Sequence, residues 1–593
     1  MDKNFFLAFF LSTLVIIGYY WMYPPEAPVP QTEVGQEAVQ PEEEQAVGTT
    51  AMKAAISLPE PLVPLKESTT RKKVSVETSL FSIGIDSQEG ILRSFYLKGY
   101  KYAIEQHTSL KTIVFDFVSE LFSGKSKKKK SLEIDPNRLI NLAGDLSVQN
   151  RVWKFSTDLG QTAVNFHISD DNLNVKREAK TLTLQATLEN GLEIYKIFTF
   201  YPNSYQIDME LKVVNRTGES QRIFPRFNFG AANEVVEFQP RARPKMGISY
   251  VDDNFEKHDD EDDYIKPFNI RNARWAGVMD TYFLTAVKMT GTEELFNGEL
   301  HAIDSVLADN VVKIPKLEYT ESKVDLLDNQ EYSKQFSLFM GPKEHDLLEE
   351  FDKSLIFSMD LGWFDWLAQP ILVVLRWIQT YVINWGVAII LLTIVVRIAM
   401  LPLAYKGMIS MAKMSDLSPQ MAKIREKHKG NKQQLNKEIM EFYKKNKVNP
   451  MGGCFPMLLQ IPIFIALYQA LLPAIELRHS PFMLWIDDLS AADFTLILPL
   501  LMGVTMFLQQ SLTPTPAMDP TQAKMMKWMP LMFIFFFLDM PSGLVLYWVV
   551  SNVISIFQQM FFNKIKKSKG IGTQAKAHAP IPVSSKGKKK KKK

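Results

Sequence analysis

YVINWGVAIILLTIVVRIAMLPL, residues 381–403, is the stretch that decides the fold. An apolar run of this length matches the roughly 20 residues with which a helix crosses a hydrocarbon core of about 30 Å. Arg397 interrupts the run near its end. A guanidinium inside an apolar span costs about 2.5 to 3.5 kcal/mol on insertion scales, so we expect a compensating polar environment. The stretch therefore predicts a membrane span with a candidate functional cation.

Two interpretations of Arg397 stay open at this point. The side chain can snorkel to the cytoplasmic headgroups, since only about seven residues separate it from the helix end. Alternatively it faces a water-filled cavity, and polar side chains at membrane depth favour this. Thr393 lies one turn away on the same helix face. Others lie within or at the ends of further apolar segments: Gln460, Gln469, Gln509 and Ser551. One cation without a paired carboxylate favours a wetted groove over a proton or cation pump.

Five more apolar segments predict further spans, which makes six in all. They are 5–23, 454–474, 494–509, 526–538 and 544–562. The loop 405–450 carries eleven Lys or Arg against four acids, so the positive-inside rule places it in the cytoplasm, where a break near Gly430 predicts a helical hairpin. The segment 526–538 is shorter than a full span. Both chain ends are then cytoplasmic.

The region between the first two spans reads as water-soluble. Residues 24–73 are rich in Pro, Glu and Gln without a period, which is typical of an extended linker. Short alternating runs follow over 74–343, with Asn190-Gly191 as a hairpin turn, and predict a large β-sandwich domain. Residues 344–362 have a helical apolar face and predict one amphipathic helix, which lies either on the bilayer surface or on the β domain.

These patterns divide the chain into eight segments. They are an anchor (1–23), a linker (24–73), a periplasmic β domain (74–343), an amphipathic helix (344–362), an interfacial piece with the second span (363–404), a cytoplasmic hairpin (405–450), four spans (451–562) and a basic tail (563–593). The tail holds twelve lysines and no acid. Such a tail suits anionic partners such as RNA or lipid headgroups, or it merely sets the topology.

Signatures of catalysis and of cofactor or metal binding are missing from the sequence. The single cysteine, Cys454, excludes an intrachain disulfide and a cysteine-based metal cluster. The run Gly124-Lys125-Ser126 resembles the end of a phosphate-binding loop, but Ser119 stands where that loop needs its first glycine. No zinc-protease, nucleophile-elbow or dinucleotide fingerprint occurs. We therefore expect neither enzyme activity nor a cofactor, and no sequence-specific nucleic-acid binding.

The C-terminal part contains a series of distinctive motifs within about 363–562. These motifs are Val396-Arg397 through Leu401-Pro402-Leu403, Asn449-Pro450-Met451-Gly452-Gly453-Cys454-Phe455-Pro456, Gln460-Ile461-Pro462-Ile463-Phe464, Leu498-Pro499 with Met502-Gly503-Val504-Thr505-Met506-Phe507, and Pro541-Ser542-Gly543-Leu544-Val545-Leu546-Tyr547-Trp548. In content and order they resemble the YidC family of membrane protein insertases. The anchor and the large external domain resemble the Gram-negative form of that family by architecture.

The resemblance implies an inner-membrane insertase with five core helices around a hydrophilic groove and a periplasmic β-supersandwich. Arg397 would be the positive charge of the groove and Thr393 its polar neighbour, with Gln460, Gln469, Gln509, Tyr547, Trp548 and Ser551 as further groove residues. The family usually has Tyr where this chain has Trp548, which keeps an aromatic surface but changes the hydrogen-bonding group. Implied partners are nascent membrane proteins, the lipid bilayer, the Sec translocon and the ribosome, the last through the hairpin and the basic tail.

Two other function classes compete with this expectation. A transporter or channel for a small anion would use Arg397 as its binding site, but we find no convincing inverted repeat of the kind that such proteins ordinarily contain. A tethered carbohydrate-binding or isomerising enzyme would leave the polar residues of the spans unexplained. Reconstitution with a labelled single-span substrate separates these classes.

Overall fold

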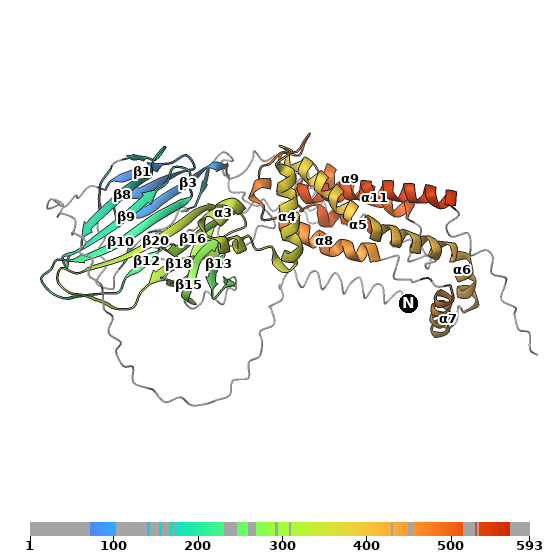
Figure 1. The fold of residues 1–593 in the computed structure, drawn as a ribbon, viewed down its shortest axis with the longest axis horizontal. Coiled ribbons are helices and arrows are strands. Elements are labelled where there is room, and N and C mark those ends of the chain that lie inside the picture. Colours follow the sequence, from blue (N-terminus) through green and yellow to red (C-terminus); the bar gives the residue numbers. More distant parts are fainter. Residues whose placement is uncertain are drawn as a thin grey trace, which may run out of the picture. The chain divides into compact units, whose positions relative to one another are not determined.

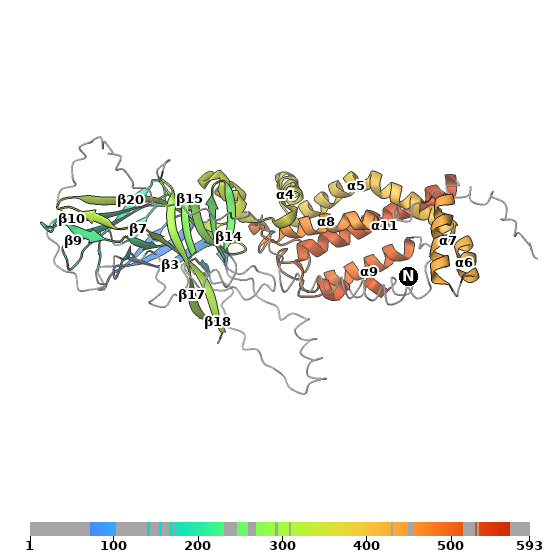
Figure 2. The ribbon, with the colours of Figure 1, turned by 90° about the horizontal axis from the view of Figure 1, so that it is seen from below.

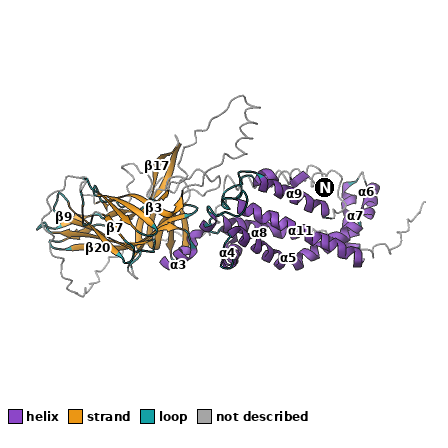
Figure 3. Ribbon diagram, turned by 90° about the horizontal axis from the view of Figure 1, so that it is seen from above, coloured by secondary structure: helices purple, strands orange, loops and turns teal. Residues whose placement is uncertain are grey.

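The computed structural model describes residues 71–513 and 528–569, with internal gaps that are longest at 102–138, 143–152, 157–164, 230–245, 259–267 and 514–527. The expected anchor, nearly all of the linker and most of the basic tail lie outside the described residues. The chain divides into two units, one containing Gln420–Asn446 and the other containing Glu67–Pro419 and Lys447–Lys593. Figure 3 distinguishes the strands of the first half of the chain from the helices of the second.

The β domain contains one large and two smaller sheets among the described residues. The large sheet runs in the order β5 (Phe155–Ser156), β12 (Arg226–Asn228), β18 (Asn310–Thr320), β17 (Phe296–Leu307), β15 (Phe268–Met279), β16 (Phe283–Met289), β20 (Glu331–Pro342), β10 (Gln206–Asn215), β9 (Leu192–Phe200), β8 (Lys180–Thr187) and β6 (His167–Ile168), with β13 (Met246–Val251) paired to β15 and to β14 (Asn254–His258). Figure 1 shows β9, β10 and β20 side by side.

The second sheet has the order β4 (Leu139–Asn141), β3 (Ile91–Lys101), β2 (Phe81–Asp86), β1 (Lys73–Glu77) and β7 (Asn172–Asn174). The third is the pair β11 (Gln221–Ile223) and β19 (Val324–Leu326). Nearly every described pairing is antiparallel; β1 with β7 is parallel. The mostly antiparallel β domain that the alternating runs predict is therefore present, built around a core of buried aromatic and aliphatic side chains.

The hairpin of β8 and β9 forms where the Asn-Gly pair predicts it. The two strands pair antiparallel from Lys180 opposite Phe200 to Thr187 opposite Glu193. Gly191 has a φ of +82°, a conformation that costs glycine little and other residues more. Strand β9 alternates buried and half-buried side chains at every position, the period of two that a sheet with one face in the core requires.

Lys196 of β9 is fully buried and joins the large sheet to the second one. Its Nζ donates to the backbone carbonyls of Glu89 (2.9 Å) and Gly90 (3.0 Å), in the turn between β2 and β3, and to that of Trp153 (2.9 Å). The ammonium also lies 4.6 Å from the ring centroid of Phe166. Burial of a charge is tolerable only when its donors are satisfied, and here three carbonyls satisfy them.

Residues 344–362 do not form the single amphipathic helix that their period predicts. The structure has α3 (His345–Phe351) and the 3-10 helix η3 (Lys353–Met359), separated by an extended Asp352. The Asp352 carboxylate accepts hydrogen bonds from Arg274 of β15 (3.0 Å) and from the backbone N–H of Ser354 (3.0 Å). This pairing with a strand ends the first helix, and it fits packing on the β domain rather than on a bilayer.

The second half of the chain is helical. Its elements are η4 (Gly362–Phe364), α4 (Asp365–Gln379), α5 (Trp385–Asp416), α6 (Ser418–Lys427), α7 (Lys432–Lys445), α8 (Phe455–Leu471), η6 (Ile475–Leu477), α9 (Ile497–Leu512) and α11 (Ser542–Lys569). In the described part, Trp385–Asp416 and Ser542–Lys566 are long and apolar enough to cross a membrane. Shorter apolar helices occur at Gln460–Leu471, Ile497–Leu512 and Trp528–Phe537.

The helices α5 and α11 extend beyond the apolar segments from which they are predicted. Helix α5 continues past residue 404 to Asp416, and it accommodates both Pro402 and Gly407. The interfacial piece before it is the separate helix α4, and the Asn384 side chain caps the start of α5 by accepting from Gly386 N at 2.8 Å. Helix α11 likewise runs to Lys569. Figure 2 shows α5, α8 and α11 running beside one another.

Replacing Lys196 by methionine is expected to lower the free energy of unfolding by about 3 kcal/mol, because three buried carbonyls lose their common donor. Denaturant unfolding of the full chain in detergent, followed by tryptophan fluorescence, measures this; Trp153 stacks on Phe198 beside the site. The matched control is Lys212→Met on the adjacent strand β10, where half-buried ion pairs with Glu210 and Glu331 predict a loss of about 1 kcal/mol or less. Equal losses in both variants would contradict a special role for Lys196.

Candidate functional site

The guanidinium of Arg397 is held by a neighbouring helix. Its Nε donates to the Oγ of Ser551 on α11 at 2.8 Å, and its Nη2 also contacts that oxygen. Ser551 is buried and lies nine residues into α11, roughly 14 Å along the axis at 1.5 Å per residue. The hydrogen bond directs the cation across to α11, so the charge is held between two apolar helices.

A second polar pair lies one helical turn away on α11. The Nε2 of Gln460 in α8 donates to the phenolic oxygen of Tyr547 at 3.0 Å, and Tyr547 is fully buried. Tyr547 and Ser551 are four residues apart and therefore share a face of α11. We call Arg397, Ser551, Tyr547 and Gln460 the Arg397 cluster. It draws its members from α5, α8 and α11.

The remaining candidates lie elsewhere in the described structure. Thr393 is fully buried, and its hydroxyl donates to the carbonyl of Ile389 in its own helix at 2.7 Å. Gln469 lies near the other end of α8, where its Oε1 accepts from the N–H of Phe364 in η4 at 3.2 Å. Gln509 is half-buried near the end of α9. Thr393 thus borders Arg397 along α5, whereas Gln469 holds η4 against α8.

Trp548 belongs to an aromatic group and makes no hydrogen bond to the Arg397 cluster in the described part of the chain. Its ring meets that of Phe464 edge to face at a centroid distance of 4.8 Å, and that of Phe537 at 5.2 Å. Consecutive residues of a helix point about 100° apart, because there are 3.6 residues per turn. Tyr547 therefore supplies the hydroxyl of this region, and Trp548 supplies an apolar wall beside it.

Sequence reasoning missed a polar stripe along α11. Asn552 is buried and its Nδ2 donates to the hydroxyl of Thr505 on α9 at 3.2 Å. Ser555 donates to the carbonyl of Ser551, and Gln559 to the side chain of Asn563 at 3.0 Å. The sequence does contain a signal for this stripe. Polar residues recur every four positions, at 551, 555, 559 and 563, and residues four apart share one face of a helix.

The charge of Arg397 is not neutralised by an acid in the described part of the chain, since none of the salt bridges found there involves it. Its hydrogen-bonding partner is a hydroxyl, which supplies a dipole but no counter-charge. In a low dielectric such a cation keeps a strong field. The cluster is therefore suited to attract carboxylate or polar groups that come within reach.

Two family models together match most of the chain. Residues 73–374 match the YidC periplasmic domain, and residues 377–569 match the 60Kd inner membrane protein family. The first match includes α3 and most of α4 together with the strands. These matches place the chain in a class of inner-membrane proteins that have a periplasmic domain, and the fold adds that this domain is rich in β-sheet and that the C-terminal part contains apolar helices.

Relatives at full length give the particular family. The chain is 34% identical to the membrane protein insertase YidC of Geobacter metallireducens over 95% of its own length and 98% of the relative. It is 35% identical to the insertases YidC of Maridesulfovibrio salexigens, over 95% and 99%, and of Wolinella succinogenes, over 97% of both chains. The chain belongs to the YidC family of membrane protein insertases.

Two similar solved structures match this chain at low sequence identity. An active YidC insertase crystal structure with the first transmembrane domain resolved is 18% identical and covers 83% of this chain and 93% of that one, with a TM-score of 0.33. A galactose mutarotase related enzyme from Lactobacillus acidophilus is 10% identical and covers 45% and 97%, with a TM-score of 0.26. Both scores lie below 0.5, so neither defines the architecture of the β domain.

The hydrogen bond between Arg397 and Ser551 can be isolated by a double-mutant cycle. Ser551→Ala is expected to lower stability by about 1.5 to 3 kcal/mol, the usual range for a hydrogen bond to a charged group. The same change in an Arg397→Leu background is expected to cost little, because the partner is gone. Denaturation in mixed detergent micelles measures all four proteins. Ser555→Ala is the control, because the Ser555 hydroxyl donates within its own helix. Its effect on the free energy of unfolding is expected to add to that of Arg397→Leu.

Proposed function

We propose that this chain moves apolar segments of newly made proteins from the cytoplasm into the inner membrane, and that the Arg397 cluster contacts the polar part of the substrate. The observation that supports the proposal is a guanidinium held between α5 and α11 by a hydroxyl, without an acidic partner among the described residues. A site of this kind attracts an acidic or polar tail and does not consume a nucleotide. The apolar segment of the substrate then gains about 25 cal/mol per Å² of apolar area that leaves water.

Short helices support the route that we propose for the tail. Ile497–Leu512 is an apolar helix of 16 residues, roughly 24 Å at 1.5 Å per residue, against a hydrocarbon core of about 30 Å. A helix that is too short thins the bilayer around it. Thinning shortens the apolar path for a hydrophilic tail. The polar stripe of α11, with Asn552 and Gln559, would extend the hydrated part of that path.

From the family resemblance we further propose six spans with both termini in the cytoplasm, a five-helix core around a hydrophilic groove, and a supersandwich in the β domain. We also propose that the protein cooperates with the Sec translocon and contacts the ribosome through the hairpin of α6 and α7 and through the basic tail. In the hairpin, Asn431 caps α7 by accepting from Gln434 N at 3.1 Å. The basic residues of the hairpin and tail fit an anionic partner such as ribosomal RNA.

Reconstitution tests the activity directly. Liposomes that contain the purified chain are expected to insert a labelled single-span protein with a short external tail, without ATP and without another protein. Protection of the tail from external protease is the readout, and empty liposomes are the control. Liposomes that conduct small anions but insert nothing would replace the insertase proposal by that of an anion transporter.

Arg397→Gln is expected to reduce insertion of a substrate with an acidic tail about tenfold, because one charge-assisted contact of ~1.4 kcal/mol is lost. Insertion of a matched substrate with a neutral tail is expected to fall about twofold or less, because a neutral tail makes no charge-assisted contact with Arg397. Initial insertion rates in liposomes measure both. Arg222→Gln is the control, since this arginine is exposed on β11 and pairs with Asp325. An equal loss of insertion rate for the two substrates would show that Arg397 supports the fold and does not contact the acidic tail.

A further inference from the structure

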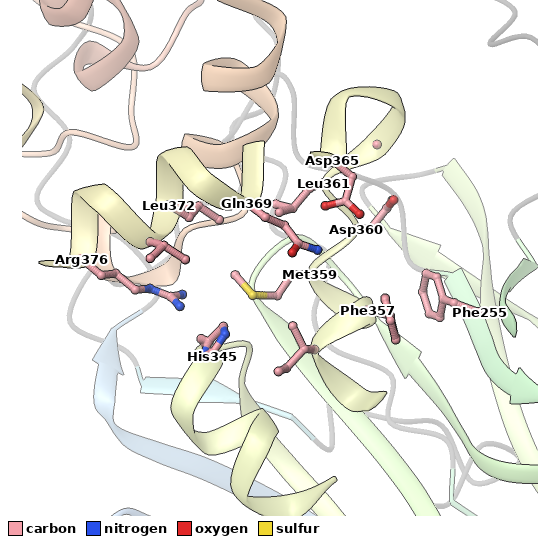
Figure 4. Close-up of a pocket in the computed structure, with 13 residues that line it drawn as sticks. Phe255, His345, Phe357, Met359, Asp360, Leu361, Asp365, Gln369, Leu372 and Arg376 are labelled. Atoms are coloured by element: carbon pink, nitrogen blue, oxygen red, sulfur yellow. The ribbon is translucent and has the colours of Figure 1, made fainter. Parts of the chain in front are cut away.

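A separate cavity of about 150 Å³ lies where η3 and η4 meet α4. It is far larger than the roughly 10–15 Å³ that admits one water molecule. Figure 4 shows Asp360, Asp365 and Gln369 gathered in one part of the cavity and Arg376 with His345 in another. None of these residues belongs to the Arg397 cluster. The cavity has an acidic end and therefore selects among ligands by charge.

Asp365 is a charged residue of this cavity that forms no ion pair with the other described residues. Its Oδ1 is buried and has no hydrogen-bond partner among them. It is the first residue of α4, where the positive end of the helix dipole favours a carboxylate, but no donor among the described residues bonds to this oxygen. Asp365 also lines the cavity, so a ligand with N–H groups can meet its carboxylate there.

The other charged residues of the cavity already have partners. Asp360 pairs with Lys257 at 2.9 Å, and Arg376 pairs with Glu476 at 3.1 Å. His345 contacts the carboxylate of Asp346 at 3.2 Å. With these pairs formed, the negative charge of Asp365 remains. A cationic group is therefore the complementary ligand, and an anion is disfavoured.

The surroundings of Asp365 are those of an amphiphile site. Apolar residues complete the cavity wall, and one of them, Val373, is 62% exposed, so the cavity reaches the surface of α4. Trp363, Trp366 and Trp377 are also exposed on η4 and α4, at 75%, 71% and 59%. Exposed tryptophans mark the headgroup level of a bilayer. A water-soluble cation needs neither these tryptophans nor an apolar wall.

We propose that this cavity binds the primary ammonium headgroup of a zwitterionic phospholipid of the phosphatidylethanolamine type. The ammonium has three N–H donors and no bulk around them, so it can approach the carboxylate of Asp365, which lines the cavity. Gln369 lies one turn further along α4 and offers amide N–H groups to the lipid phosphate. The acyl chains lie over the exposed apolar face of α4. Trimethylation of the ammonium removes all of its N–H donors and so removes the match.

Competition between two lipids tests the proposal on the full chain. The protein in detergent is mixed with equal amounts of phosphatidylethanolamine and phosphatidylcholine with identical acyl chains, and native mass spectrometry gives the ratio of the bound lipids. We expect phosphatidylethanolamine to be enriched about tenfold, the effect of one charge-assisted hydrogen bond. Asp365→Asn is expected to bring the ratio close to one. Glu350→Gln, which removes an exposed carboxylate from α3, is expected to keep the enrichment.

Three results would overturn the proposal. One is equal binding of the two lipids by the unmodified chain, which would indicate unspecific adsorption. Another is an equal preference for phosphatidylglycerol, which has no ammonium. The third is loss of the enrichment when a lysine-containing peptide is added, which would assign the site to a peptide ammonium. Stepwise methylation of the headgroup needs no variant, and a stepwise fall in binding supports the proposal even if Asp365→Asn does not fold.

Discussion

The hydrogen bond from Arg397 to Ser551 is the constraint around which the helical part is arranged. A guanidinium in apolar surroundings must have its donors met or remain in water, because its desolvation otherwise costs several kcal/mol. A hydroxyl on α11 meets this need without cancelling the charge. The helices α5 and α11 must therefore stay in contact at this level, and Gln460 of α8 is tied to the same face through Tyr547. Stability and the proposed substrate contact thus rest on the same interaction.

The same physics operates in the β domain with a different outcome. Lys196 is a fully buried cation, whereas Arg397 is half-buried, and three backbone carbonyls accept hydrogen bonds from Lys196 and so connect the two larger sheets. Because the three backbone carbonyls occupy the N–H donors of Lys196, a substrate has no donor left to bind there. Arg397 has a single hydroxyl partner in the described structure and so retains donors for other groups. Lys196 is therefore structural, and the half-buried Arg397 is a candidate for function.

Local patterns predicted several elements correctly. The Asn190-Gly191 pair marked the β8–β9 hairpin because Gly191 adopts a positive φ. The apolar stretch that ends at Leu403 predicted the core of α5. Prediction failed at Asp352, which divides the expected helix of 344–362. Its carboxylate accepts from the nearby Ser354 N–H at the start of η3 and from the distant Arg274 of β15. Periodicity considers only the apolar positions, so it detects neither the local cap nor the contact with the strand.

The candidate site divides in the same way. The sequence by itself determined which polar residues lie in apolar helices, because hydropathy and the helical period are local properties. Only the tertiary structure decided that Ser551 and Gln460 join the site of Arg397 while Gln469 binds η4, and that Tyr547 meets Gln460 while Trp548 packs against aromatic rings. The physical reason is that hydrogen bonds act over about 3 Å. Membership of the site therefore depends on how α5, α8 and α11 pack and rotate against one another, which no single helix encodes.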